Sequence, residues 1–290
     1  MHTGLQRQRT ALKVGFWLGW KTESNWTNPV FYVLWSMIPS LSSALILTFM
    51  VKVLQQAGGG TGPSLLPYVF IGSVVYSLVG SLLDSMSWAV LEDRERMGML
   101  KYIAIAPSSL YAYLFGRGFA KVATNFIAVP LTLTVGVLAL DVPISLSTIN
   151  WGLLAAVLPL GVLIITSAGL ILAGVTMMIA KHAGFLGQAV SGALYLFTGT
   201  LFPLTVLPGP LQAFARALPL TYWVEGMRRA LWADARNPAY NTGLSHIGDG
   251  ALVLILAGCA LLMVAFSLPL EGWAERRAKE KGLLDMNTAY

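Results

Sequence analysis

Charge is scarce in this sequence. Only 11% of its 290 residues are Asp, Glu, Lys or Arg, while 56% are hydrophobic. A soluble domain of this length carries about twice as much charge. Mean hydropathy is +0.68, and several apolar stretches exceed the roughly 20 residues that a helix needs to cross a bilayer. The composition therefore predicts an all-α integral membrane protein and excludes an ordinary soluble enzyme.

Residues for metal binding and covalent catalysis are also few. The single cysteine, Cys259, excludes an internal disulfide and a cysteine-based metal centre. His2, His182 and His246 fall in separate segments that cannot meet in one metal site. No serine has a His and an Asp at motif spacing, and no helix face carries paired carboxylates. We expect no metal site, no catalytic residue and no enzymatic activity in this chain.

A nucleotide-binding loop is missing. Residues 15–22 come nearest to the phosphate-binding pattern G-x-x-x-x-G-K-[ST], but Trp20 stands where the second glycine is required. If ATP drives this protein, a partner must bind it. The formal charge of +6 does not indicate nucleic acid, because the basic residues are scattered among the ends of apolar segments. Anionic lipid headgroups explain that pattern, so membrane lipids are the expected partners and nucleic acid is not.

The apolar runs predict one membrane domain over residues 1–290 with six spans. The predicted spans are residues 28–53, 65–91, 111–140, 151–180, 185–204 and 247–270. Residues 11–20 mix tryptophans with Lys13, which predicts a helix lying in the membrane interface within an N-terminal segment 1–27. Residues 92–110 form a polar loop after the second span, and residues 271–290 form a polar tail.

The basic residues predict the orientation. Fourteen of the 19 Lys and Arg residues fall on the side that holds both termini and the 92–110 loop. By the positive-inside rule, both termini and this loop lie in the cytoplasm. The five on the other side are Lys52, Arg216, Arg228, Arg229 and Arg236.

Residues 205–246, before the last span, hold two short amphipathic segments joined at Pro219. Pro208 precedes the first, and the second carries Glu225 and Arg228. Each segment is too short to cross a bilayer, so they predict a re-entrant or surface-lying helical pair on the outer side. Broken backbone at membrane depth requires burial within protein or a cavity.

The polar run EDRERMGMLK at residues 92–101 cannot lie in hydrocarbon, where a central Arg or Asp costs roughly 2.5 to 3.5 kcal/mol. Its charged residues and Gly98 suit docking on a partner protein. The alternative is that the charges merely end the helix in water. The docking candidates are Glu92, Arg94, Glu95, Arg96 and Gly98.

Two motifs carry a family resemblance. Residues 91–100, with Ala106-Pro107 and Gly116-Arg117, resemble the cytoplasmic element of ABC type 2 export permeases. Residues 202–208, continued by residues 217–222 and 225–228, are similar to that family's second signature before the last span. The Phe202-Pro203 and Leu207-Pro208-Gly209 motifs resemble the drug and lipid exporters of the family more than its glycan exporters.

The resemblance implies a permease subunit that exports a hydrophobic or amphiphilic substrate across the plasma membrane of a bacterial or archaeal cell. It implies that the 92–110 loop is a coupling helix docked on a separate ATP-binding-cassette subunit. Two such subunits would carry ATP and Mg²⁺, and two permease protomers would form the conduit. No cofactor is then expected on this chain itself.

Small and aromatic side chains suggest where the path runs. Ser77 and Ser81 belong to a stripe of serines spaced by four along the second span, which places them on one helix face. Helix packing is the simpler role of that stripe, and lining of the conduit is the alternative. Tyr195, Phe197 and Phe202 are candidates for contacting a hydrophobic substrate.

Asp84 is the one clear acidic residue predicted inside a span. It could pair with Arg117 or Lys121 as a gate contact, or reach interfacial water. A secondary transporter or channel remains the alternative function, although such proteins place several ionisable groups at mid-membrane.

Overall fold

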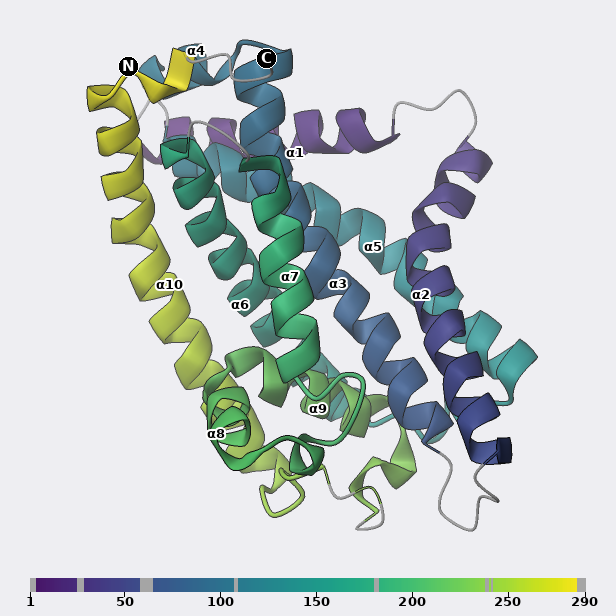
Figure 1. Cartoon of the computed structure of the whole chain (residues 1–290). Helices are drawn as coiled ribbons and strands as arrows, with labels where there is room; N and C mark the ends of the chain where they lie inside the picture. The colour runs from purple at the N-terminus through teal and green to yellow at the C-terminus, as the bar shows by residue number, and fades with distance from the viewer. Residues whose placement is uncertain are drawn as a thin grey trace.

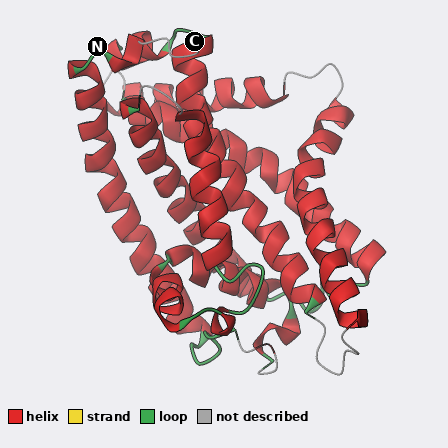
Figure 2. Ribbon diagram, viewed as in Figure 1, coloured by secondary structure: helices red, strands yellow, loops and turns green. Residues whose placement is uncertain are grey.

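The computed structural model describes residues 4–24, 29–57, 65–106, 109–179, 183–237, 240 and 242–285. Pro107, Lys181 and His182 lie outside the described residues. Within the described part all regular elements are helices (Figures 1 and 2). They are α1 (Gly4–Ser24), α2 (Pro29–Ala57), α3 (Leu66–Leu91), η1 (Glu92–Arg96), α4 (Leu100–Ile105), α5 (Leu110–Leu140), α6 (Trp151–Met178), η2 (Ala183–Phe185), α7 (Leu186–Phe197), η3 (Leu204–Val206), α8 (Gly209–Ala217), α9 (Pro219–Leu231), η4 (Ala233–Arg236), α10 (Asp249–Glu280) and η6 (Leu283–Asp285).

Five helices of the described part are long and apolar enough to cross a membrane: α2, α3, α5, α6 and α10. This finding confirms a multi-pass, all-helical membrane protein. The starts of α3, α5 and α6 lie within one residue of the predicted spans. Helix α10 continues ten residues beyond the predicted end of its span. Its 32 residues extend about 48 Å, which is more than the roughly 30 Å thickness of the hydrocarbon core.

The fifth predicted span, residues 185–204, is the main difference. Helix α7 has only 12 residues, about 18 Å, and the chain turns immediately after it. Gly199 adopts φ +69°, a conformation that glycine takes without strain, and Pro203 follows before η3. The residues that end α7 early are thus polar and small. A six-span arrangement does not follow from helix length.

Helix α3 forms the centre of the bundle. It packs against α2, α5, α6, α7 and α9, while α10 lies along α6. Nineteen of its 26 residues are buried. Most faces of this helix are apolar, and protein surrounds most of it.

The two ends of the bundle carry different elements. Both chain termini, α1 and α4 lie at one end, whereas α8 and α9 lie at the other (Figure 1). We call these the terminal end and the hairpin end. The predicted separation of the polar 92–110 loop from the outer helical pair agrees with this arrangement.

Helix α1 crosses the start of α5 at the terminal end (Figure 1). Glycines permit this close approach: a Cβ on Gly15 would overlap the backbone of Tyr113, and one on Gly116 would overlap the backbone of Leu12. Ser109 caps α5 by accepting a hydrogen bond from the backbone N–H of Ala112 at 3.4 Å. The N-terminal helix is therefore fixed to the bundle instead of extending from it.

Candidate functional site

The charged element after α3 is a π-helical turn. Residues Glu92–Arg96 continue α3 directly, and the Met97 N–H donates to the Glu92 carbonyl at 2.9 Å, five residues back. Such wide turns occur frequently at functional sites. Gly98 then adopts φ +60° and lets the chain turn into α4.

Asp93 anchors this turn to α5. Its side chain is 0% exposed, and it accepts hydrogen bonds from the Tyr113 hydroxyl at 2.8 Å and from Arg117 Nη1 at 3.1 Å. Arg117 also bonds Glu92 Oε2 at 2.8 Å. A buried carboxylate needs partners of this kind, because an unpaired charge would cost several kcal/mol. The sequence analysis did not single out Asp93 as a site residue.

The predicted docking residues divide into two groups. Arg94 is buried, where it donates to the Ile179 carbonyl at 3.2 Å and pairs with Glu95 at 2.8 Å. Arg96 is 81% exposed on its side chain and contacts Glu92 at 3.4 Å. Arg94 thus holds the element to the end of α6, whereas the side chain of Arg96 is exposed.

Helix α4 presents apolar side chains outward. Leu100 and Ala104 are buried against the bundle, but Tyr102 is 64% and Ile105 is 78% exposed. Lys279 of α10 donates to the Ala104 carbonyl at 2.7 Å, which fixes the position of the helix. We call the exposed residues Arg96, Met97, Gly98, Tyr102 and Ile105 the α4 surface.

A cleft of about 970 Å³ lies beside α3, with walls from α2, α5 and α7. Ser77, Ser81, Asp84 and Ser85 line it along α3, and it reaches Arg96 at the terminal end. We call it the serine cleft. The predicted serine stripe therefore lines a cavity from Ser77 onward.

Polar side chains inside the serine cleft bond to one another. Ser40 donates to Ser77 Oγ at 3.0 Å, and the Asn125 amide donates to Ser81 Oγ at 2.6 Å. Asp84 is half-buried in the wall. The carboxylates of Glu92 and Asp93 bind the guanidinium of Arg117. Arg117 is therefore engaged away from Asp84, whereas Lys121 lines the same cleft.

The predicted aromatic substrate contacts do not line the serine cleft. Tyr195 donates to Ser73 Oγ at 3.1 Å and packs on Tyr76, with ring centroids 4.6 Å apart. Phe197 meets Phe214 of α8 edge to face at 5.2 Å. Phe202 is half-buried in the turn after α7. In this structure Tyr195 joins α7 to α3, and Phe197 joins α7 to α8.

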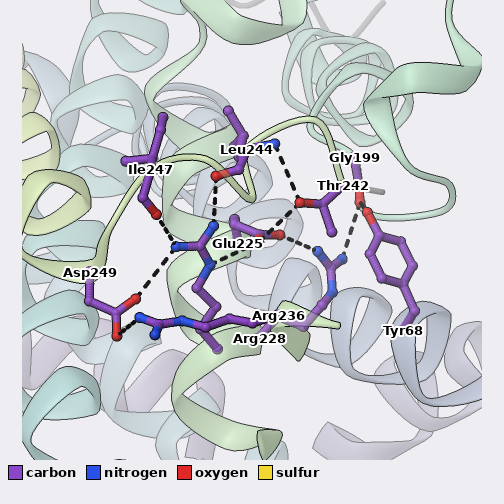
Figure 3. Close-up of polar contacts among 10 residues, drawn as sticks. Tyr68, Gly199, Glu225, Arg228, Arg236, Thr242, Leu244, Ile247 and Asp249 are labelled. Atoms are coloured by element: carbon purple, nitrogen blue, oxygen red, sulfur yellow. Dashed lines mark hydrogen bonds and ion pairs between the residues drawn. The ribbon is translucent and has the colours of Figure 1, made fainter. Parts of the chain in front are cut away.

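At the hairpin end, a buried ionic cluster is centred on Glu225 of α9 (Figure 3). Pro208 and Pro219 precede and begin α8 and α9, as the predicted breaks required. Glu225 is 3% exposed and pairs with Arg228 at 3.1 Å and Arg229 at 2.9 Å. The three side chains share one helix face, because they are spaced by three and four residues.

Arg228 links α9 to α3 and to the turn after α7 (Figure 3). Its guanidinium stacks on the ring of Tyr68 and donates to the Gly199 carbonyl at 3.1 Å. The Tyr68 hydroxyl donates to the same carbonyl at 2.8 Å. The irregular backbone after α7 is thus buried with its carbonyl satisfied, as non-helical chain at membrane depth requires.

Arg229 extends the cluster to the loop before α10. It donates to the carbonyls of Leu244 at 2.8 Å and Ile247 at 2.7 Å. Asp249 binds both Arg229 and Arg236. The sequence analysis missed Tyr68, Arg229 and Asp249. The spacing of Glu225, Arg228 and Arg229 was the one available signal.

No group of three or more His, Cys, Asp or Glu side chains gathers in a metal-binding arrangement among the described residues. The described geometry thus consists of a polar cleft, an exposed surface at one end and a rigid ionic cluster at the other.

A comparison with curated proteins finds no match. The family model of the ABC-2 type transporter matches residues 11–232. The matched region contains α3, the π-helical turn, α4, the serine cleft and the hairpin pair α8 and α9. It covers well over half of the 290 residues. The chain belongs to the ABC-2 type transporter family.

Proposed function

We propose that this chain is the permease subunit of an ATP-driven exporter of hydrophobic or amphiphilic molecules, drug-like compounds or lipids. Two copies form the conduit, and two separate ATP-binding subunits hold ATP and Mg²⁺. The protein lies in the plasma membrane with both termini in the cytoplasm. The observation that carries this proposal is the serine cleft, which opens toward the α4 surface within a chain of the ABC-2 type transporter family.

The α4 surface supports docking of an ATP-binding subunit. Tyr102 and Ile105 are exposed at the terminal end, beside a charged segment that belongs in water. Apolar side chains in such a position are covered by a partner protein at low cost. Arg96 adds a charged rim, which favours orientation and rapid association more than raw affinity.

The serine cleft supports an amphiphilic cargo. Ser77, Ser81 and Asn125 line the cavity with hydroxyl and amide groups, and Trp35 and Trp88 line it with aromatic rings. The lining is therefore both polar and aromatic. Only 17% of the most apolar stretch of α2 is buried within the chain. Lipid or a second protomer covers the rest of that helix, and a second protomer would close the conduit.

The proposal includes one more membrane crossing besides the five long helices, and α7 would supply it. Helix α7, the turn at Gly199 and the pair α8 and α9 together bring the chain to the hairpin end. Thr198 and Thr200 are buried in that turn and share a hydrogen bond at 2.8 Å. We infer that α7 and this turn complete the fifth crossing, with α8 and α9 bordering the outer exit.

The test is transport by the chain with and without its ATP-binding partner. Purification in mild detergent identifies a partner by its phosphate-binding loop, and both proteins are then placed in vesicles loaded with a fluorescent amphiphile. Efflux should require ATP, should stop when the partner's phosphate-binding lysine is replaced, and should survive an ionophore. Efflux by the chain alone that the ionophore abolishes would instead establish the secondary-transporter alternative.

A further inference from the structure

A second cleft, of about 570 Å³, lies at the terminal end between α1, α5 and α10. It shares no lining residue with the serine cleft. We call it the α10 cleft. The residues that matter here are Arg9, Leu12, Phe115, Leu268, Glu271 and Glu275.

Glu271 is the unusual residue of this cleft. It is 1% exposed, and its Oε1 atom has no hydrogen-bond partner among the described residues. A buried carboxylate oxygen without a donor is costly, and native proteins rarely leave one unexplained. The two acidic residues that follow it on the same helix are paired, Glu275 with Lys279 at 2.6 Å and Glu280 with Arg277 at 3.3 Å.

Two of the basic residues that follow Glu271 on α10, Arg277 and Lys279, are engaged elsewhere. Lys279 binds Glu275 and the Ala104 carbonyl, and Arg277 binds Glu280. A donor from outside the protein would complete the coordination of Glu271. A compact ammonium group fits this role, because it brings three hydrogen-bond donors and a positive charge to one oxygen cluster.

The position of Glu271 along α10 indicates where that ammonium comes from. Glu271 lies 22 residues after Asp249, about 33 Å along the helix, so the two ends of the hydrocarbon core fall near these residues. The α10 cleft thus opens at headgroup depth. Leu12, Phe115 and Leu268 give it an apolar wall, while Arg9 stands on its α1 side.

These groups match the parts of one lipid. We propose that the α10 cleft binds a phospholipid with a primary-amine headgroup. The ammonium bonds to Glu271, Arg9 faces the phosphate, and the acyl chains lie along Leu12, Phe115 and Leu268. A choline headgroup has no N–H to donate, and a purely anionic headgroup would bring negative charge to a carboxylate. The cleft therefore distinguishes among lipids by the donors of the headgroup.

The test is native mass spectrometry of the full chain released from nanodiscs that contain phosphatidylethanolamine, phosphatidylcholine and phosphatidylglycerol in equal amounts. We expect the unmodified chain to retain phosphatidylethanolamine at least fivefold over either of the other two. Glu271→Gln should remove this preference. Glu280→Gln is the matched control, because it neutralises an exposed carboxylate on the same helix outside the cleft, and it should leave the preference unchanged.

Arg9→Gln tests the site from the exposed α1 side if Glu271→Gln does not fold. It should lower retention of phosphatidylethanolamine at least threefold. Equal retention of the three lipids by the unmodified chain, or a preference that both variants keep, would overturn the proposal. Soluble phosphoethanolamine, added in molar excess over the protein, should displace no lipid. Displacement would show a site for the free headgroup and would overturn the assignment to a membrane lipid.

Discussion

The guanidinium of Arg228 lies over the ring of Tyr68, with 3.6 Å between Cζ and the ring centroid. This contact joins α9, which borders the hairpin end, to α3 at the centre of the bundle. Both side chains also bond the Gly199 carbonyl in the turn after α7. Three segments far apart in the sequence therefore depend on one buried arginine.

Replacement of Arg228 should destabilise the protein far more than removal of the Tyr68 hydroxyl. Arg228→Gln deprives buried Glu225 of one cation, and breaking a buried pair costs about 3 to 5 kcal/mol. Tyr68→Phe keeps the stacked ring and loses one hydrogen bond, about 1 kcal/mol. Thermal unfolding of the purified chain in detergent measures both.

Arg216→Gln on α8 is the control for this comparison. Arg216 is exposed and reaches Gln212 only at 3.4 Å, so its loss should change stability by less than about 0.5 kcal/mol. If Arg228→Gln unfolds at the same temperature as Arg216→Gln, the cluster does not hold the hairpin end together.

Substitution of two nearby arginines of the π-helical turn should affect two different properties, stability for Arg94 and partner binding for Arg96. Arg94→Gln removes the hydrogen bond to the Ile179 carbonyl and the ion pair with Glu95, so the unfolding temperature should fall. Arg96→Glu should leave stability unchanged and weaken binding of the ATP-binding subunit about tenfold, which corresponds to about 1.4 kcal/mol. Binding of the purified partner and detergent thermal melts separate the two effects.

Arg277→Glu is the matched charge reversal for Arg96→Glu. Arg277 is an exposed arginine on α10 and pairs with Glu280 within the chain. Partner binding should be unaffected by this change. Equal weakening by the two reversals would mean that the partner responds to overall charge and not to the α4 surface.

How much the sequence could predict depends on how local each feature is. Long apolar runs predicted α3, α5 and α6 closely, because twenty apolar residues need no tertiary information to indicate a span. The shortness of α7 was not predicted, since Thr198 and Gly199 end it in a turn whose carbonyl is satisfied by Arg228 from a distant segment. Hydropathy alone carries no information about that contact.

The sequence predicted which segments carry the candidate site, but not which of their side chains are buried and which are exposed. A charge run indicates contact with water, yet Asp93 and Arg94 are buried because Tyr113, Arg117 and the end of α6 supply partners. The serine stripe was predicted on one helix face, and Ser77 and Ser81 do share a cavity. Ser73 belongs to the same stripe but is covered by Tyr195, which only the packing of α7 determines.

Gly161 should tolerate no larger side chain. A Cβ at this position of α6 would overlap the indole of Trp223, a rigid and fully buried side chain of α9. Gly161→Ala should cost about 1 to 3 kcal/mol, as overpacking of a core typically does. Gly192→Ala on α7 meets open space and should be neutral or slightly stabilising in the same thermal assay. A neutral Gly161→Ala would mean that α9 shifts easily against α6.

Accessibility of two serines on α3 should test the serine cleft and the orientation together. With Cys259→Ala as background, Ser81→Cys places a thiol in the cleft and Ser73→Cys places one beneath Tyr195, two turns along the same helix. A membrane-impermeant maleimide should modify the first position at least tenfold faster than the second. It should do so when it is added to inside-out vesicles and not when it is added to right-side-out vesicles.

The direction follows from the cleft, which reaches Arg96 at the terminal end, and from the positive-inside rule, which predicts that end in the cytoplasm. Equal rates at the two positions would argue against an open cleft, and faster labelling in right-side-out vesicles would reverse the orientation and make the α4 surface inaccessible to a cytoplasmic ATP-binding subunit.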